Sequence, residues 1–325
     1  MKIKGLLHDH IDGCAVLVQK ICEFYKLANM PFPFSSIEAW IDFFQNPQED
    51  IIKRFSTINN VLQTAEALEE LGYAYGKYRA EQGYVYVEAK FAPQYHTHGG
   101  LSMRQATEAM RAGLSKAEKK YSIRILPQIC IGRETDAETG IEIAKICLDY
   151  GGEVVMDLAC DEANHPPEKH LAAYKLTYKT CVRRDCHTGE WVLPEPKKTY
   201  RRRLLQNIRT AVYKLKADGI SHAIPLVDDP RLVAYMADNG IRLSGCPAAY
   251  RHAGLIKDIE ELKIPELLDA GIIYTLNTDD DLFLPPMPEV IASCQKIGLT
   301  KAHWEKIAGN VWKGAFAPDA KRYLK

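Results

Sequence analysis

Short runs rich in β-branched and aromatic residues alternate along the chain with longer stretches of helical periodicity. Eight of the short runs qualify as strands, at residues 6–10, 84–91, 123–130, 153–159, 181–187, 219–223, 241–246 and 272–277. Amphipathic stretches between them cover residues 64–82, 103–120, 138–150, 170–179, 205–217, 230–239 and 259–270. Strands that alternate with helices pair in parallel, and eight such units can close on themselves. The alternation therefore predicts an α/β protein with a (β/α)8 barrel of the TIM type.

The segment between the first two strands is longer than the others. Residues 15–82 exceed what one crossover needs, so we expect extra helices there, capping the barrel mouth. No linker, repeat or low-complexity tract divides the chain, which predicts a single domain over residues 1–325. A doubly wound open sheet is the weaker alternative, because it needs a glycine-rich phosphate turn after the first strand and residues 8–13 are not one.

Composition narrows the possible partners and the compartment. The 42 acidic and 42 basic residues cancel, which gives nucleic-acid binding no support. No run approaches the ~18 apolar residues of a membrane span, and a leader of ~15–30 residues would remove the first candidate ligand at position 8.

The nine cysteines form no C-x-x-C pair and favour a reduced, cytoplasmic protein with no disulfide framework. Six of them lie in apolar segments and are expected to be buried thiols: Cys22, Cys130, Cys147, Cys181, Cys246 and Cys294. The oligomeric state cannot be read from the sequence.

The first strand carries two histidines and an aspartate on one face. Side chains alternate along a strand, so His8, His10 and Asp12 point the same way. Two imidazoles at this spacing can reach one metal ion. A second H-x-H, at His96 and His98, has no carboxylate two residues on and has the composition of a loop.

Other polar groups follow the later strands, where the active sites of such barrels gather. They are residues 157–162, residues 187–190, His222 and residues 277–281. Each has an ordinary explanation when taken alone, such as a packed histidine, a carboxylate in the first turn of a helix, or a helix cap. Their occurrence together at strand ends that converge favours a site.

The residue types at these ends suit hydrolysis at a metal. His8, His10, His187 and Asp279 form a nitrogen and oxygen set suited to one zinc ion per chain, with a position left for water. Zinc lowers the pKa of such a water towards ~7. Glu190 is placed to move a proton on the substrate. His222 and Asp280 remain to face the substrate or support the ligands.

At these residues the chain resembles the adenosine deaminase family. The shared motifs appear in family order and span nearly the whole chain. They are the opening H-x-H-x-D-G and residues 87–93, 157–162, 187–190, 221–223, 246–247 and 276–280.

The resemblance implies a zinc-bearing (β/α)8 barrel that replaces a purine 6-amino group by oxygen and releases ammonia. Zinc would be held by His8, His10, His187 and Asp279. Glu190 would protonate the ring nitrogen beside the attacked carbon, and His222 would orient or deprotonate the attacking water. Asp280 would bond the imidazole edge of the purine, and the backbone N–H of Cys160 the other ring nitrogen. Asp12 would hold the ribose 5′-hydroxyl.

The resemblance also bears on the substrate. His10 would contact the substrate as well as the metal. Members of the family that act on free adenine usually carry Glu at the position of Asp12, and members that act on nucleotides carry Asn. Asp12 therefore favours a nucleoside, adenosine or 2′-deoxyadenosine, converted to inosine or 2′-deoxyinosine. The alternatives are another purine (adenine, an N6-modified purine or a nucleotide) and a non-catalytic purine-binding relative.

The chain departs from the family pattern around the site. Cys160 and Thr188 stand where glycine and alanine are usual, and Ser221 and Ala223 flank His222 where glycine is usual. Residues 248–250, Ala-Ala-Tyr, replace Thr-Ser-Asn, and Asp281 stands where proline is common. The ligands and Glu190 are retained, so these departures bear on the substrate more than on the chemistry.

Two other metal-dependent classes fit less well. A two-metal barrel hydrolase would need a carboxylated lysine at the end of the fourth strand. Residues 154–162 contain no lysine, and Lys90 is the nearest candidate. A cytidine-type deaminase needs H-x-E followed by P-C-x-x-C, and only the first half occurs, at residues 303–305.

Overall fold

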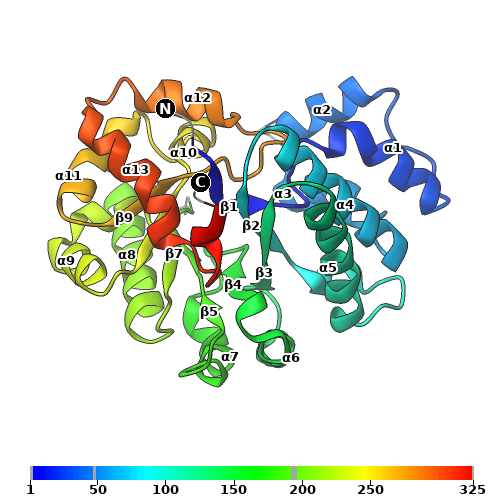
Figure 1. Cartoon of the computed structure of the whole chain (residues 1–325), viewed down its shortest axis with the longest axis horizontal. Helices are drawn as coiled ribbons and strands as arrows, with labels where there is room; N and C mark the ends of the chain where they lie inside the picture. Colours follow the sequence, from blue (N-terminus) through cyan, green and yellow to red (C-terminus); the bar gives the residue numbers. More distant parts are fainter. Residues whose placement is uncertain (1–2, 47–48, 192–195, 324–325) are drawn as a thin grey trace.

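The computed structural model describes residues 3–46, 49–191 and 196–323. Parallel strands form the centre and helices surround them (Figure 1). The strands pair in the orders β1-β2-β3-β4-β5 and β6-β7-β8-β9. Their bounds are β1 Gly5–His10, β2 Tyr86–Phe91, β3 Arg124–Gly132, β4 Val155–Ala159, β5 Arg183–Arg184, β6 His187–Thr188, β7 Gly219–His222, β8 Arg242–Gly245 and β9 Ile273–Leu276.

The predicted fifth strand is split in two, and this split forms the first seam between the sheets. Asp185 lies between β5 and β6, and its N–H donates to the Met156 carbonyl of β4 at 2.8 Å. One residue further on, the Cys186 carbonyl accepts from the N–H of Ser221 in β7 at 2.9 Å. The short fifth strand therefore carries the ladder across from β4 to β7.

The second seam joins the first strand to the last. The side-chain Oδ1 of Asn277 accepts from the N–H groups of Leu7 and His8 at 2.8 and 3.1 Å. An isolated parallel bridge then pairs Asp9 with Asp279. These contacts close the sheet, so the predicted (β/α)8 barrel is confirmed.

The helices follow the predicted pattern with two differences at their ends. Helix α8 begins eight residues earlier than the apolar pattern indicated, at Lys197, because its first turns are polar and exposed. The stretch 259–270 is a 3-10 turn, Ile259–Leu262, followed by α11, because Lys263 adopts a left-handed φ of 47° and proline follows at 265. The helices are α1 Leu17–Leu27, α2 Ile37–Gln45, α3 Ile51–Asn59, α4 Ala65–Glu81, α5 Met103–Lys120, α6 Ala137–Tyr150, α7 Leu171–Leu176, α8 Lys197–Tyr213, α9 Pro230–Asp238, α10 Pro247–His252, α11 Ile264–Asp269, α12 Met287–Cys294 and α13 Lys301–Gly314.

The long first connection contains α1, α2 and α3 before the crossover helix α4, as expected. The ring of Phe283, seven residues past β9, lies 5.4 Å from that of Phe44 in α2 and 6.2 Å from that of Phe55 in α3. Because Phe283 follows the C-terminal end of a strand, these contacts place α2 and α3 beside the barrel mouth.

Charged side chains occupy the barrel interior. Arg242 on β8 donates to Glu88 at 2.6 Å and to Asp185 at 2.8 Å. Lys90 on β2 donates to Asp157 on β4 at 3.0 Å. All five side chains are essentially inaccessible to solvent. Buried charges are tolerated only when they are paired, and here each one is.

Two expectations from composition can be compared with the structure. All nine cysteines are free, as expected, but Cys181 is exposed and Cys22 half-buried. The prediction for Cys181 was wrong because this residue lies in a bend before β5, outside the strand. Among the described residues no helix is both long and apolar enough to cross a membrane.

Replacing Arg242 by leucine tests the interior pairing. The change leaves Glu88 and Asp185 without their shared guanidinium, and breaking a buried pair typically costs about 3–5 kcal/mol of unfolding free energy. Denaturant titration measures this loss. Arg104→Leu, which removes an exposed ion pair with Asp149, is the control and should change stability little. Equal stability of the Arg242 variant and the wild type would contradict the pairing argument.

Candidate active site

Several strand ends carry backbone strain on non-glycine residues. Cys160 after β4, His222 and Ala223 at the end of β7, and Asp279 after β9 have φ values of 75°, 79°, 48° and 67°. Such left-handed conformations cost free energy and cluster at functional sites. Here they bring side chains from different strands towards one point.

The four predicted metal ligands lie together at this point. Asp279 Oδ1 lies 3.0 Å from His8 Nε2 and 3.4 Å from His10 Nε2. His10 Nε2 lies 3.2 Å from His187 Nε2. His8 and Asp279, 271 positions apart in the sequence, thus meet through closure of the barrel.

The hydrogen bonds around His8 define which ring nitrogen carries its proton. Ser221 Oγ lies 2.8 Å from His8 Nδ1 and donates its own proton to Asp185 at 3.4 Å. The hydroxyl therefore accepts from Nδ1–H, and His8 Nε2 is left bare towards Asp279. Burial lowers the pKa of His8 well below its ordinary value, so the ring is neutral.

His187 is oriented in a similar way. Its Nδ1 lies 2.9 Å from Asp157 Oδ2, so its Nε2 points at His10. Burial also lowers the pKa of His10, to about 3. Bare ring nitrogens beside a carboxylate oxygen are the donor set of a divalent metal, and three nitrogens with one oxygen suit zinc. The residues present fit the metal that the sequence predicts.

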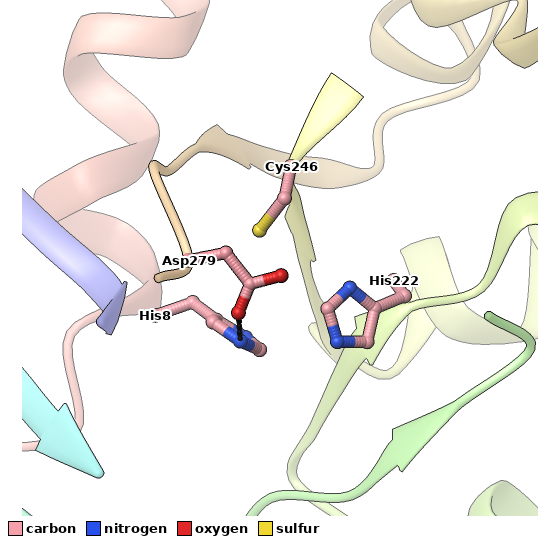
Figure 2. Close-up of side chains that lie close together, drawn as sticks. All are labelled: His8, His222, Cys246 and Asp279. Carbon is pink, nitrogen blue, oxygen red and sulfur yellow. Dashed lines mark hydrogen bonds and ion pairs between the residues drawn. The ribbon is translucent and has the colours of Figure 1, made fainter. Parts of the chain in front are cut away.

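A second group of possible ligands overlaps the first. His8, His222, Cys246 and Asp279 also lie within ligand distance of one another, and Figure 2 shows their side chains converging. Cys246 directly follows β8 and is fully buried. We did not expect a ligand role for Cys246 from the sequence, because a cysteine in an apolar strand has the pattern of a core thiol.

Glu190 faces His222 across the site. Its Oε2 lies 3.1 Å from His222 Nε2, the distance of a close ion pair. Burial raises the pKa of Glu190 well above its ordinary value, and the charges of Asp279 and Glu162 raise it further. A carboxyl group with a pKa raised in this way keeps its proton to a higher pH than an exposed glutamate does, and it can act as an acid.

Glu162 holds the segment that carries Glu190, a role that the sequence analysis missed. Its carboxylate accepts from the hydroxyl of Thr188 at 2.6 Å and from the N–H groups of Gly189 and Glu190 at 2.8 and 3.2 Å. Gly189 has a φ of 83°, and a Cβ there would lie 2.8 Å from the Cα of Ala223. The acidic pair after the fourth strand was a visible signal, but its partners lie 26 or more residues away.

Asp12 and Asp280 present carboxyl groups near the ligands. A Cβ at Gly13 would overlap the Asp280 carboxylate, so glycine is needed beside it. Burial raises the pKa of Asp12 to about 6, and burial with the neighbouring carboxylates raises the pKa of Asp280. Asp280 Oδ1 is buried and has no hydrogen-bond partner in the part of the chain that the structure describes. Among the described residues, no basic side chain forms an ion pair with either carboxylate.

Cys160 lies beside a polar pair. Its Sγ is 3.3 Å from the hydroxyl of Tyr95, which also contacts the Glu134 carboxylate. Unlike the six cysteines of the core, Cys160 is exposed.

Lys90 does not fit the two-metal alternative. Burial alone would lower the pKa of Lys90, but the carboxylates of Asp157 and Asp185 outweigh it and raise the pKa. The side chain is an ion-paired ammonium group, whereas carboxylation requires a neutral amine.

The other histidine motifs have structural partners. His96 stacks on Phe91, and its Nδ1 lies 2.9 Å from the Leu62 carbonyl, within the 3-10 turn Pro93–His96. His303 caps the start of α13 and lies 3.1 Å from Asp269. Neither histidine is in a metal-like cluster of the described residues.

Known proteins resemble this chain in sequence. The model of the adenosine deaminase family matches residues 4–324. An adenosine deaminase of Enterococcus faecalis is 27% identical over 331 residues, covering 98% of this chain and 93% of the relative. One from Clostridium botulinum (strain Langeland) is 27% identical, covering 84% of this chain and 80% of the relative.

Solved structures share the fold at lower identity. An adenine deaminase from Arthrobacter aurescens has a TM-score of 0.84 at 21% identity, covering 100% of this chain and 97% of that one. An amidohydrolase from Burkholderia ambifaria with bound Zn has a TM-score of 0.83 at 22% identity, covering 99% of this chain and 87% of that one. An N6-mAMP deaminase from Arabidopsis has a TM-score of 0.79 at 19% identity, covering 99% of this chain and 96% of that one.

The structural matches establish the barrel, and the family match extends over nearly all of the chain. It includes every strand end described above. The chain belongs to the adenosine deaminase family and is a hydrolase of the class that acts on C–N bonds of cyclic amidines.

Proposed function

We propose that this chain is a zinc-dependent deaminase of 6-aminopurine nucleosides, which converts adenosine or 2′-deoxyadenosine to the inosine form and ammonia. The observation that carries the proposal is the meeting of three histidines and an aspartate beside a carboxyl group with a raised pKa, Glu190. The chain acts as one domain, residues 1–325, with one zinc. Nine free thiols agree with a reducing compartment such as the cytoplasm.

Zinc is held by His8, His10, His187 and Asp279 in this proposal. Two of these rings are fixed from behind, by Ser221 and by Asp157, which is how proteins orient metal-bound histidines. When bound, zinc lowers the pKa of a coordinated water towards ~7 and supplies a nucleophile at neutral pH.

Glu190 and Asp280 handle the purine. The C6–O bond forms and the C6–N6 bond breaks, and the two protons of the water end on ring nitrogen N1 and on the departing ammonia. Glu190 gives N1 its proton and is reprotonated from the water. Asp280, whose raised pKa keeps a proton available, donates to the imidazole edge of the base.

Asp12 selects the sugar end of the substrate. A carboxylate can accept from a ribose 5′-hydroxyl, whereas a 5′-phosphate would meet Asp12 without a basic side chain to balance it. The alternatives are adenine, an N6-modified purine or a nucleotide, since the structural neighbours include an adenine deaminase and an N6-mAMP deaminase. A non-catalytic purine-binding protein would not need a protonated carboxyl group at Glu190.

Metal analysis tests the ligand set. Purified protein should contain about one zinc per chain, and His10→Ala should lose most of it because one nitrogen ligand is gone. His98→Ala, which alters the exposed histidine of the second H-x-H, is the matched control and should keep its zinc. Two zinc ions per chain, or full zinc content in His10→Ala, would contradict the site.

Replacing Glu190 by glutamine tests the proton donor. The amide keeps the shape and the zinc but cannot give up a proton, so turnover should fall by roughly 10²–10⁴-fold. Glu168→Gln, at the contact with Thr210 and Lys214, should leave the rate unchanged. Near-normal turnover of the Glu190 variant with intact zinc would remove the proton-donor role.

Ammonia release from a substrate panel tests specificity. Adenosine and 2′-deoxyadenosine should react, and adenine, AMP and guanine derivatives should react poorly. Asp12→Asn should lower kcat/KM for adenosine by roughly 10–100-fold, as expected for a hydrogen bond to a charged group, and leave adenine unaffected. The nucleoside assignment fails if both nucleosides are inert while a base or nucleotide turns over.

A further inference from the structure

Tyr250 contacts His222 on the side of the ring away from Glu190. The residue lies in α10, just after β8, and its side chain is 1% exposed. Its hydroxyl oxygen is 3.2 Å from His222 Nδ1, and the two rings pack edge to face with centroids 5.6 Å apart. The same oxygen accepts from the backbone N–H of Cys246 at 2.9 Å.

These two contacts fix the direction of the hydrogen bond. A tyrosine hydroxyl has one proton to donate and needs an acceptor when buried. The Cys246 N–H can only donate, so the Tyr250 oxygen accepts from it. Among the described residues the acceptor within reach of Tyr250 is His222 Nδ1.

We propose that Tyr250 donates to His222 Nδ1 and holds this ring in the tautomer that carries its proton on Nε2, so that His222 orients the attacking water as a donor and does not deprotonate it. Tyr250 is a positioning residue, since it acts through His222. The role of His222 in turnover rests on the proposed function, whereas its tautomer does not.

The surroundings of Nε2 agree with this assignment. Nε2 faces Glu190 Oε2 at 3.1 Å and has no aligned hydrogen bond. An Nε2–H group there can donate to an oxygen placed between the two side chains. His222 cannot take a proton from the water as well, because Nε2 already carries one and Nδ1 is occupied by the hydrogen bond from Tyr250. Proton transfer then falls to Glu190, and the two roles open to His222 reduce to one.

The tautomer can be measured directly in the zinc-loaded wild type. In ¹⁵N NMR of histidine-labelled protein, His222 is identified by the signals lost in His222→Gln. We expect its Nδ1 to resonate as a bare, hydrogen-bonded nitrogen and its Nε2 as N–H. A proton on Nδ1 would overturn the proposal. This experiment uses no substrate, so it stands even if the activity proposed above is wrong.

Tyr250→Phe tests the consequence for turnover. The variant keeps the ring but loses one hydrogen bond, so kcat should fall about tenfold with KM and zinc content unchanged. The His222 Nδ1 signal should move as its bond is lost. Tyr274→Phe is the matched control, because Tyr274 is also buried near β8 but its hydroxyl has no hydrogen-bond partner among the described residues. That variant should match the wild type in rate and in the His222 signals.

Three outcomes would count against the role of Tyr250. One is a Tyr250 variant with wild-type kcat. Another is an unchanged Nδ1 signal in that variant. The third is an equal loss of kcat in the Tyr274 variant, which would point to general packing.

Discussion

The ion pair between Lys90 and Asp157 connects the barrel interior to the active site. The two groups are 3.0 Å apart and inaccessible to solvent, and Asp157 also lies 2.9 Å from Nδ1 of His187. A buried carboxylate without a cation is strongly unfavourable, so Lys90 is what allows Asp157 to stay ionised there. The ionised Asp157 then orients the His187 ring. In the barrel interior, Arg242 neutralises the buried carboxylates of Glu88 and Asp185 in the same way.

Around this framework, several residues of the candidate site are each held by a buried partner. Ser221 fixes His8, Glu162 fixes the turn that carries Glu190, and Tyr250 contacts His222. The side chains of the candidate site are thus held in place by the protein itself, which is the condition for effective electrostatic catalysis. The left-handed residues at the strand ends are the strained backbone that such placement requires.

The sequence predicted the barrel well because its signals are local. Strand runs and helix periods each depend on neighbouring residues, and the strand ends carried the polar groups. The same patterns could not predict the split fifth strand, which is fixed by pairing with distant strands. They also missed the early start of α8, because its polar and exposed first turns carry no apolar period. Cys181 was misjudged because the predicted strand began too early: β5 begins only at Arg183, and Cys181 lies in an exposed bend before it.

The partners of the site residues were largely beyond sequence reasoning. Glu162 was visible as part of an acidic pair, but its contacts with Thr188 and Gly189 depend on how two strand ends meet. Tyr250 was noticed only as a departure from the family pattern. Its bond to a histidine 28 residues away follows from the fold of β7 and β8.

The central claim is that zinc is bound by three histidines and Asp279, with Cys246 nearby but outside the ligand set. X-ray absorption at the zinc edge of the loaded wild-type protein tests this directly, because sulfur and nitrogen ligands lie at different distances. The proposed site predicts nitrogen and oxygen neighbours alone, at about 2.0–2.2 Å. A sulfur neighbour at about 2.3 Å would place the metal on the group that contains His222 and Cys246, and would contradict the claim.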